Sequence, residues 1–188
     1  SRETFRQKKY ADYKIQRPPM PDGLSNQIPL IKEILQAYGF KIMEKEGFEA
    51  DDLMATLAKK AKHAGLATVI VSSDKDILQL VSDNVEIFNP YKDGGIIYDL
   101  KNVHEKFGVP PEKIKDVIAL MGDAADNIPG VPGVGEKTAL ELIKEFDDVS
   151  NLLKHINDIR KEKLKSAIEE NIDKIRLNKE LAELDCTV

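Results

Sequence analysis

The feature that most limits the fold is a short apolar run that leads into two aspartates. Residues 68–71 read Thr-Val-Ile-Val, all β-branched, and Asp74 and Asp76 follow within five positions. Short apolar runs of β-branched residues are typical of strands buried inside a parallel sheet. In such sheets, ligands sit beyond the carboxyl ends of the strands. The run therefore predicts a buried strand, with both aspartates at the ligand-binding edge of the sheet.

Strands and helices alternate around this run in the first half of the chain, and helices take over in the second half. The apolar spacing predicts helices at residues 27–38, at 50–64 and from 76, short strands at 40–43, 68–71, 85–88 and 96–98, and a turn at 93–95. After residue 99 the expected helices are broken near Gly108, at a glycine-rich turn and near Asp147. The pattern predicts an α/β fold whose core, over residues 1–98, is a doubly wound, mostly parallel sheet, followed by a helical region over 99–188.

The composition excludes several classes of protein. With 188 residues, 41% hydrophobic and 32% charged, the chain is long enough for one globular domain with a sizeable core. Its apolar runs are far too short to span a bilayer, so we expect no membrane partner. Cys186 is the single cysteine, which rules out a disulfide framework and fits a cytoplasmic location. The net charge of −5 at first sight argues against a nucleic-acid partner. Much of the negative charge, however, lies in three acidic clusters, where bound metal ions would neutralise it.

Seven carboxylates fall into three clusters. They are Glu49, Asp51 and Asp52; Asp74 and Asp76; and Asp123 and Asp126. Clustered acids repel one another unless protons or a cation neutralise them. Hard divalent cations prefer oxygen ligands, and phosphoryl chemistry commonly uses them in pairs. Each cluster alone has a plainer explanation, as helix N-terminal charge, a helix cap or a solvated turn. Three clusters near one sheet edge favour a shared metal site.

A glycine-rich turn follows the third acidic cluster directly. Gly130, Gly133 and Gly135 permit positive φ and close backbone approach, and Lys137 and Thr138 open the next helix. Exposed backbone N–H groups at a helix start suit phosphate. An ordinary helix–loop–helix joint is the alternative, but such a joint normally needs one glycine. The three glycines therefore indicate a turn that binds the phosphate backbone of a nucleic acid without preference for its sequence.

The first seventeen residues are basic and contain two tyrosines. Lys14 and Arg17 are interleaved with Tyr10 and Tyr13, and the same segment also carries Arg6 but only two acids. Cations beside aromatic rings suit a single-stranded or frayed nucleic-acid end, because the rings stack on bases. A solvated charged surface explains the composition equally well.

Taken together, these motifs resemble the 5′-nuclease domain of bacterial DNA polymerase I and its stand-alone relatives, the flap endonuclease family. The matching stretches are residues 4–6, 13–18, 49–52, 73–80 and 122–139. They cover nearly the whole chain in the family's order, and the last stretch is highly specific. The resemblance implies hydrolysis of DNA at 5′ flaps and 5′ ends in replication and repair, by a two-metal mechanism with Mg²⁺ or Mn²⁺.

The resemblance also implies roles for individual residues. The first metal would be served by Glu49, Asp51, Asp52 and Asp74, and the second by Asp76, Asp123 and Asp126. The catalytic set would be Lys14, Asp51, Asp74 and Asp76. The DNA contacts would come from Arg6, Tyr13, Lys14 and Arg17 in a basic, arch-like first segment, and from Gly130, Gly133, Gly135, Lys137 and Thr138. These last five belong to a helix–three-turn–helix element, which often binds K⁺ through its carbonyls, in a DNA-binding region over residues 99–188.

The chain departs from the family at its start. Members begin with a strand that bears a metal-site aspartate, and a second aspartate precedes the position of Ser1. We therefore expect a separate or truncated chain with an incomplete first metal site, which cleaves poorly by itself. A DNA-binding module without catalysis is the main alternative, and a ribonuclease on a related acidic core is a weaker one. We expect a monomer that binds DNA, with a covalently attached polymerase domain as a further possibility.

Overall fold

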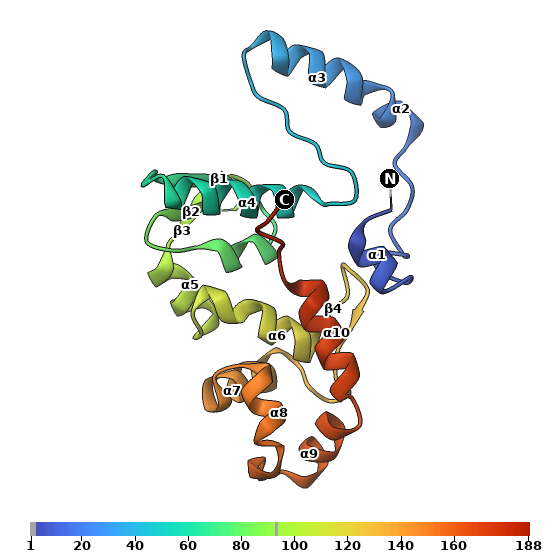
Figure 1. The fold of residues 1–188 in the computed structure, drawn as a ribbon, viewed down its shortest axis with the longest axis vertical. Coiled ribbons are helices and arrows are strands. Elements are labelled where there is room, and N and C mark those ends of the chain that lie inside the picture. The colour runs from blue at the N-terminus through green and yellow to red at the C-terminus, as the bar shows by residue number, and fades with distance from the viewer. Residues whose placement is uncertain (1–2, 93) are drawn as a thin grey trace.

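A three-stranded sheet lies in the first half of the chain (Figure 1). The computed structural model describes residues 3–92 and 94–188. In it, β1 (Thr68–Val71) runs parallel to β2 (Val85–Asn89), and β2 runs antiparallel to β3 (Ile96–Tyr98). Only one of these two described pairings is parallel, so the expected mostly parallel sheet is not confirmed. The expected turn at 93–95 includes Asp93, which lies outside the described residues.

The described helices largely follow the predicted order. They are α1 (Phe5–Lys9), α2 (Asp22–Ser25), α3 (Gln27–Ala37), α4 (Ala50–His63), α5 (Leu100–Phe107), α6 (Ile114–Met121), α7 (Glu136–Phe146), α8 (Val149–Lys154), α9 (Glu162–Glu169) and α10 (Ile172–Ala182), with 3₁₀ helices at Asp76–Leu80, Pro111–Lys113 and Ile156–Asp158. The structure confirms the predicted helices as α3 and α4. Among the described residues, no helix has both the length and the apolar character that a membrane crossing needs.

One local prediction is wrong. Residues 40–43 do not form a strand, because this segment has no neighbouring strand to pair with and runs as an extended link from α3 to α4. The helix predicted from Asp76 is present as a short 3₁₀ helix, Asp76–Leu80. The structure also adds a short hairpin of β4 (Gly122–Asp123) and β5 (Ile128–Pro129), which carries the third acidic cluster.

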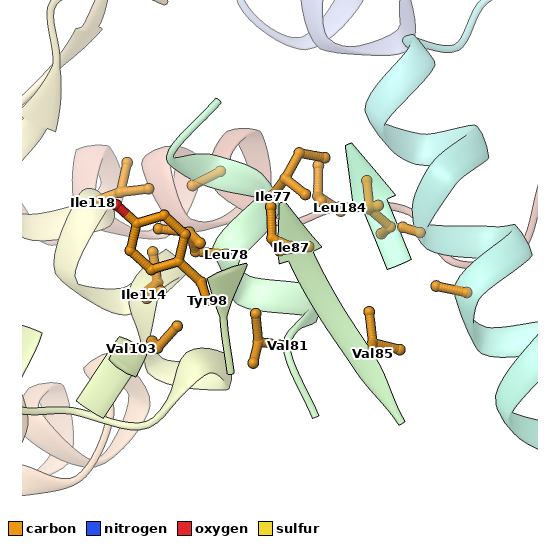
Figure 2. Packing of buried hydrophobic residues seen from close by; sticks show 14 of the residues in the cluster. Ile77, Leu78, Val81, Val85, Ile87, Tyr98, Val103, Ile114, Ile118 and Leu184 are labelled. Atoms are coloured by element: carbon orange, nitrogen blue, oxygen red, sulfur yellow. The ribbon is translucent and has the colours of Figure 1, made fainter. Parts of the chain in front are cut away.

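One face of the sheet covers the first hydrophobic core (Figure 2). Ile87 and Tyr98 from the sheet pack with Ile77 of the 3₁₀ helix before β2, Val103 of α5 and Ile118 of α6. Leu184, which follows α10, joins the same cluster, so the end of the chain packs beside the strands.

The other face of the sheet is open. Ile70 of β1 is buried, but Val69 and Val71 on the opposite face are 60% and 63% exposed. The prediction that this strand is buried on both faces is therefore wrong for the described structure. The run of β-branched residues identified a strand correctly, but it did not show how many layers cover it.

The helical half has a core of its own around α6. Leu120, Ile143, Leu152, Ile168 and Ile175 are each at most 2% exposed and pack between α6, α7, α8, α9 and α10. The fully buried Asn178 of α10 donates to the carbonyl oxygens of Ala119 at 3.0 Å and Pro129 at 2.7 Å. Helix α10 therefore fixes both α6 and the hairpin that follows it.

Candidate functional site

The first and third acidic clusters meet around Tyr13. The Tyr13 hydroxyl lies 2.8 Å from Asp126 Oδ2 and 3.0 Å from Glu49 Oε2, so its single O–H hydrogen is shared between the two carboxylates. Glu49 immediately precedes α4, and Asp126 lies between β4 and β5. Two segments far apart in the sequence are thus held together by one phenol.

The second cluster lies between the other two. Asp74 follows the carboxyl end of β1, and its charge contributes to the raised pKa of Asp51 at the start of α4. On the other side, the Lys75 ammonium is 3.1 Å from Asp123 Oδ2. The structure therefore brings all three clusters together at the carboxyl end of β1, the edge where open α/β sheets bind ligands.

The ionised forms of two of these carboxyls, Asp51 and Asp76, are disfavoured, so their pKa values are raised. Burial, and then the charges of Asp74 and Asp123, raises the pKa of Asp76 to about 7. Burial and the charge of Asp74 likewise raise the pKa of Asp51 to about 6. Asp76 Oδ1 is buried and has no hydrogen-bond partner among the described residues. A cluster of oxygen donors with an unsatisfied buried carboxylate oxygen fits a hard divalent cation.

Basic side chains also lie among the acids. Lys14 Nζ is 2.6 Å from Glu49 Oε1 and 3.4 Å from Asp126 Oδ2, and Arg17 is 2.7 Å from Asp126 Oδ1. Within residues 3–92 and 94–188, no three acidic, histidine or cysteine side chains stand close enough to hold one metal ion. Ligation of one cation by three of these acids therefore requires their carboxylates to move closer together than they stand here.

Lys14 sits in an unusual backbone conformation. Its φ of 57° lies in the left-handed region that non-glycine residues rarely adopt. Its N–H donates to the Asp126 carbonyl oxygen at 3.0 Å, which ties the basic segment to the third acidic cluster. Such backbone strain is frequent at functional sites, where the surrounding structure maintains it.

Arg6 and Asp52 do not lie where the family pattern led us to expect. Arg6 is 1% exposed and Asp52 is fully buried, and the two form a pair with N–O distances of 2.8 Å. A DNA phosphate cannot reach this guanidinium, and a cation cannot reach this carboxylate. In the described structure both residues belong to the scaffold, which corrects their predicted roles.

Tyr13 also departs from its predicted role. It is 2% exposed, so its ring cannot stack on a base in this structure. Burial and the charges of Glu49 and Asp126 raise the pKa of its hydroxyl. The phenol thus stays protonated and orients two carboxylates, a role that the basic and aromatic composition of the segment did not reveal.

The glycine turn combines packing with exposure. A Cβ on Gly130 would collide with the Met121 carbonyl oxygen, so this glycine is required where the hairpin crosses α6. Gly133 has a φ of 79° and open space beside it, and Gly135 precedes α7 with open space as well. Lys137 is exposed in the first turn of α7, and Thr138 is half-buried beside it.

Sequence reasoning missed the position of Lys75. No role was predicted for it, yet its ammonium pairs with Asp123 at 3.1 Å. Partial burial lowers the pKa of Lys75, but its hydrogen bond to Asp123 outweighs this and raises the pKa overall. A single cation flanked by two aspartates was the signal in the sequence.

Comparisons with known proteins agree on one family. A model of the N-terminal resolvase-like domain of 5′-3′ exonucleases matches residues 1–108, and a model of their C-terminal SAM fold matches residues 109–188. The 5′-3′ exonuclease of Aquifex aeolicus is 49% identical over 160 residues, which cover 85% of this chain and 55% of that protein. DNA polymerase I of Rhizobium leguminosarum is 45% identical over 184 residues, which cover 98% of this chain but 18% of that protein.

A solved structure shows the same fold. The bacteriophage T5 flap endonuclease, crystallised as a pseudo-enzyme–product complex with DNA and metal ions, matches with a TM-score of 0.82 and 26% identity. The match covers 98% of this chain and 71% of that one. This α/β nuclease fold with its helical SAM-like region, together with both family models, establishes that the chain belongs to the 5′-3′ exonuclease family.

Proposed function

We propose that this chain is the nuclease region of a protein that hydrolyses DNA phosphodiesters at 5′ flaps and 5′ ends. One observation carries the proposal: three acidic clusters meet at the carboxyl end of β1, where burial and mutual repulsion raise the pKa values of Asp51 and Asp76. The relative from bacteriophage T5 supports it, because that flap endonuclease was crystallised with DNA and metal ions.

Six carboxylates remain as candidate metal ligands once Asp52 is set aside. Glu49, Asp51 and Asp74 would hold one cation, and Asp76, Asp123 and Asp126 a second. All are oxygen donors, which suits Mg²⁺ or Mn²⁺. Two such cations, when bound, supply activation of the attacking water and stabilisation of the leaving oxygen.

The chain's own basic groups would position the scissile phosphate. Lys14 and Arg17 lie at the rim of the acidic clusters, and Arg17 keeps 53% of its side chain exposed. With Glu49 and Asp126 engaged as metal ligands, Lys14 and Arg17 would lose their acidic partners and would be free to contact phosphate oxygens. Tyr13 would keep Glu49 and Asp126 next to each other, because its hydroxyl lies within hydrogen-bond distance of both.

The glycine turn would grip the duplex part of the substrate. Gly133 and Gly135 have open space beside their backbones, and Lys137 is exposed next to the start of α7. Backbone N–H groups and the helix dipole at such a start favour a phosphate without reading the bases. The prediction that carbonyls of the 128–137 turn bind K⁺ stays a prediction.

The roles in replication and repair are proposals based on relatives. This chain spans about half the length of the A. aeolicus exonuclease and about a fifth of the length of the R. leguminosarum polymerase. An attached polymerase domain, as in the latter protein, is part of this proposal. The proposal also includes that the protein is a monomer.

The deciding experiment compares Asp74→Asn with Asp83→Asn in the full-length product of the gene. Asp74 lies in the site, whereas Asp83 is exposed in the turn before β2. With Mg²⁺ and a 5′-flap DNA, we expect Asp74→Asn to slow cleavage at least about a hundredfold, a loss of about 3 kcal/mol of transition-state stabilisation. Binding of the flap DNA should persist, and Asp83→Asn should cleave normally.

Two results would count against this function. Normal cleavage by Asp74→Asn would show that the acidic clusters take no part in the reaction. Binding of flap DNA by the wild-type protein without any cleavage would instead favour a DNA-binding module that lacks catalysis.

A further inference from the structure

The buried Arg6 uses all of its donors within the protein. Its Nε donates to the Leu181 carbonyl oxygen and one terminal nitrogen to the Glu183 carbonyl oxygen, both at 2.8 Å. Both terminal nitrogens also donate to Asp52 at 2.8 Å, and one of them reaches Glu49 Oε2 at 3.2 Å. Burying a guanidinium is costly unless its hydrogen bonds are satisfied in this way.

Asp52 completes the arrangement from the other side. Besides the two bonds from Arg6, its carboxylate accepts the Glu49 N–H at 3.0 Å and the Asp185 N–H at 2.9 Å. Burial acts to raise the pKa of Asp52, but the hydrogen bonds from Arg6 and Asp185 outweigh it and lower the pKa. The pair therefore joins α1, the start of α4 and the segment that follows α10.

This junction touches the acidic site through Glu49. Arg6 contacts one oxygen of Glu49, while the other oxygen faces Lys14. Asp52 holds the Glu49 backbone and directly follows Asp51 in the first turn of α4. The position of both candidate ligands thus depends on a pair that is itself inaccessible to substrate.

We propose that Arg6 and Asp52 are positioning residues that couple the segment 181–185 to Glu49 and Asp51, and so set the affinity of the site for divalent cations. This inference rests on the proposed metal-dependent function. Side chains that orient metal ligands typically change metal affinity about 10- to 100-fold when they are removed. A pair that served only stability would leave metal affinity unchanged in a folded variant.

An apolar replacement separates these two roles. Buried ion pairs can often be exchanged for apolar residues of similar size with little loss of stability. The double variant Arg6→Met with Asp52→Leu removes the hold on Glu49 while filling the same space. The matched control is Lys9→Met with Glu180→Leu, because this exposed pair, at 2.7 Å, also connects α1 with α10.

The test is a calorimetric Mn²⁺ titration of the full-length gene product without DNA, with circular dichroism and thermal melting to verify folding. We expect the Arg6/Asp52 double variant to bind Mn²⁺ about 10- to 100-fold more weakly. High Mn²⁺ should restore its cleavage of flap DNA with an unchanged KM for DNA. The Lys9/Glu180 control should bind Mn²⁺ like the wild-type protein.

The outcomes are distinguishable. A folded Arg6/Asp52 double variant with wild-type Mn²⁺ affinity would overturn the inference and leave the proposed function standing. If the double variant does not fold, Arg6→Lys decides, because an ammonium keeps the charge but cannot reach all four partners; wild-type affinity in Arg6→Lys also overturns the inference. Absence of Mn²⁺ binding by the wild-type protein would overturn both the inference and the proposed function.

Discussion

The helical half closes a core around α6, whereas the α/β half leaves apolar side chains in contact with solvent. Every large hydrophobic side chain that is exposed in the described part of the chain lies at or before Leu100. They include Val69, Val71 and Ile97 on the open face of the sheet and Ile31 and Ile34 on α3. In the helical half, Leu152, Ile168 and Ile175 are instead almost completely buried.

The difference follows from geometry. A sheet has two faces and needs a covering layer on each, and the described elements form a core on one face. Helix α6 is instead enclosed by neighbours, because α7, α8 and α10 contact it from several sides. Helix α3 has no buried residue at all and lies away from the rest of the molecule in Figure 1. In the helical half the apolar core is therefore enclosed on all sides, whereas in the α/β half part of the apolar side chains stays exposed to solvent.

The largest expected effect contrasts a truncation in each half. Ile168→Ala in the helical core should lower the free energy of unfolding by about 2–5 kcal/mol, since it leaves a cavity in a fully buried site. Val71→Ala on the open sheet face should cost less than about 1 kcal/mol. Urea unfolding of both variants measures the contrast. Equal costs would break the comparison, because they would mean that the sheet face is covered in solution.

A smaller effect concerns the charge of Asp76, where the two halves meet. Because its pKa in the folded protein is raised to about 7, ionisation destabilises the folded state. The stability of the metal-free protein should fall as the pH rises from about 4 through 7. In EDTA at pH 8, Asp76→Asn should therefore raise the free energy of unfolding by about 1–3 kcal/mol.

The pH series supplies the control for Asp76. At pH 4 both the wild-type carboxyl and the asparagine are mostly neutral, so the difference between them should nearly vanish. A gain that is equal at pH 4 and pH 8 would show that packing, and not charge, is responsible.

The smallest expected effect lies on α3. Ile34 is 56% exposed, so Ile34→Gln should change the free energy of unfolding by less than about 0.5 kcal/mol. Urea unfolding beside Ile143→Ala, which removes a buried side chain from α7, provides the scale. A loss above about 2 kcal/mol from Ile34→Gln would show that α3 is packed in solution, at odds with its exposed position here.

Much of the local structure was predictable because local patterns encode it. The spacing of apolar residues predicted α3 and α4, and Gly65, at a φ of 70°, ends the latter. The β-branched run predicted β1, and its sequence neighbours placed Asp74 and Asp76 at the ligand-binding edge. The acidic clusters and the glycine turn also pointed to the family that the comparisons established.

Only the tertiary structure decided which of these side chains face the site. Arg6 and Asp52 are 46 residues apart, and Arg6 and Glu183 are 177 apart, so no local pattern shows that they meet. The family resemblance implied the same role for Arg6 and Arg17, yet one is buried and the other exposed. By itself, the sequence determined where the carboxylates and the helices α3 and α4 lie along the chain and where β1 runs, because these depend on neighbouring residues. Burial, ion pairing and the open face of the sheet depend on which distant elements pack together, and that only the folded chain shows.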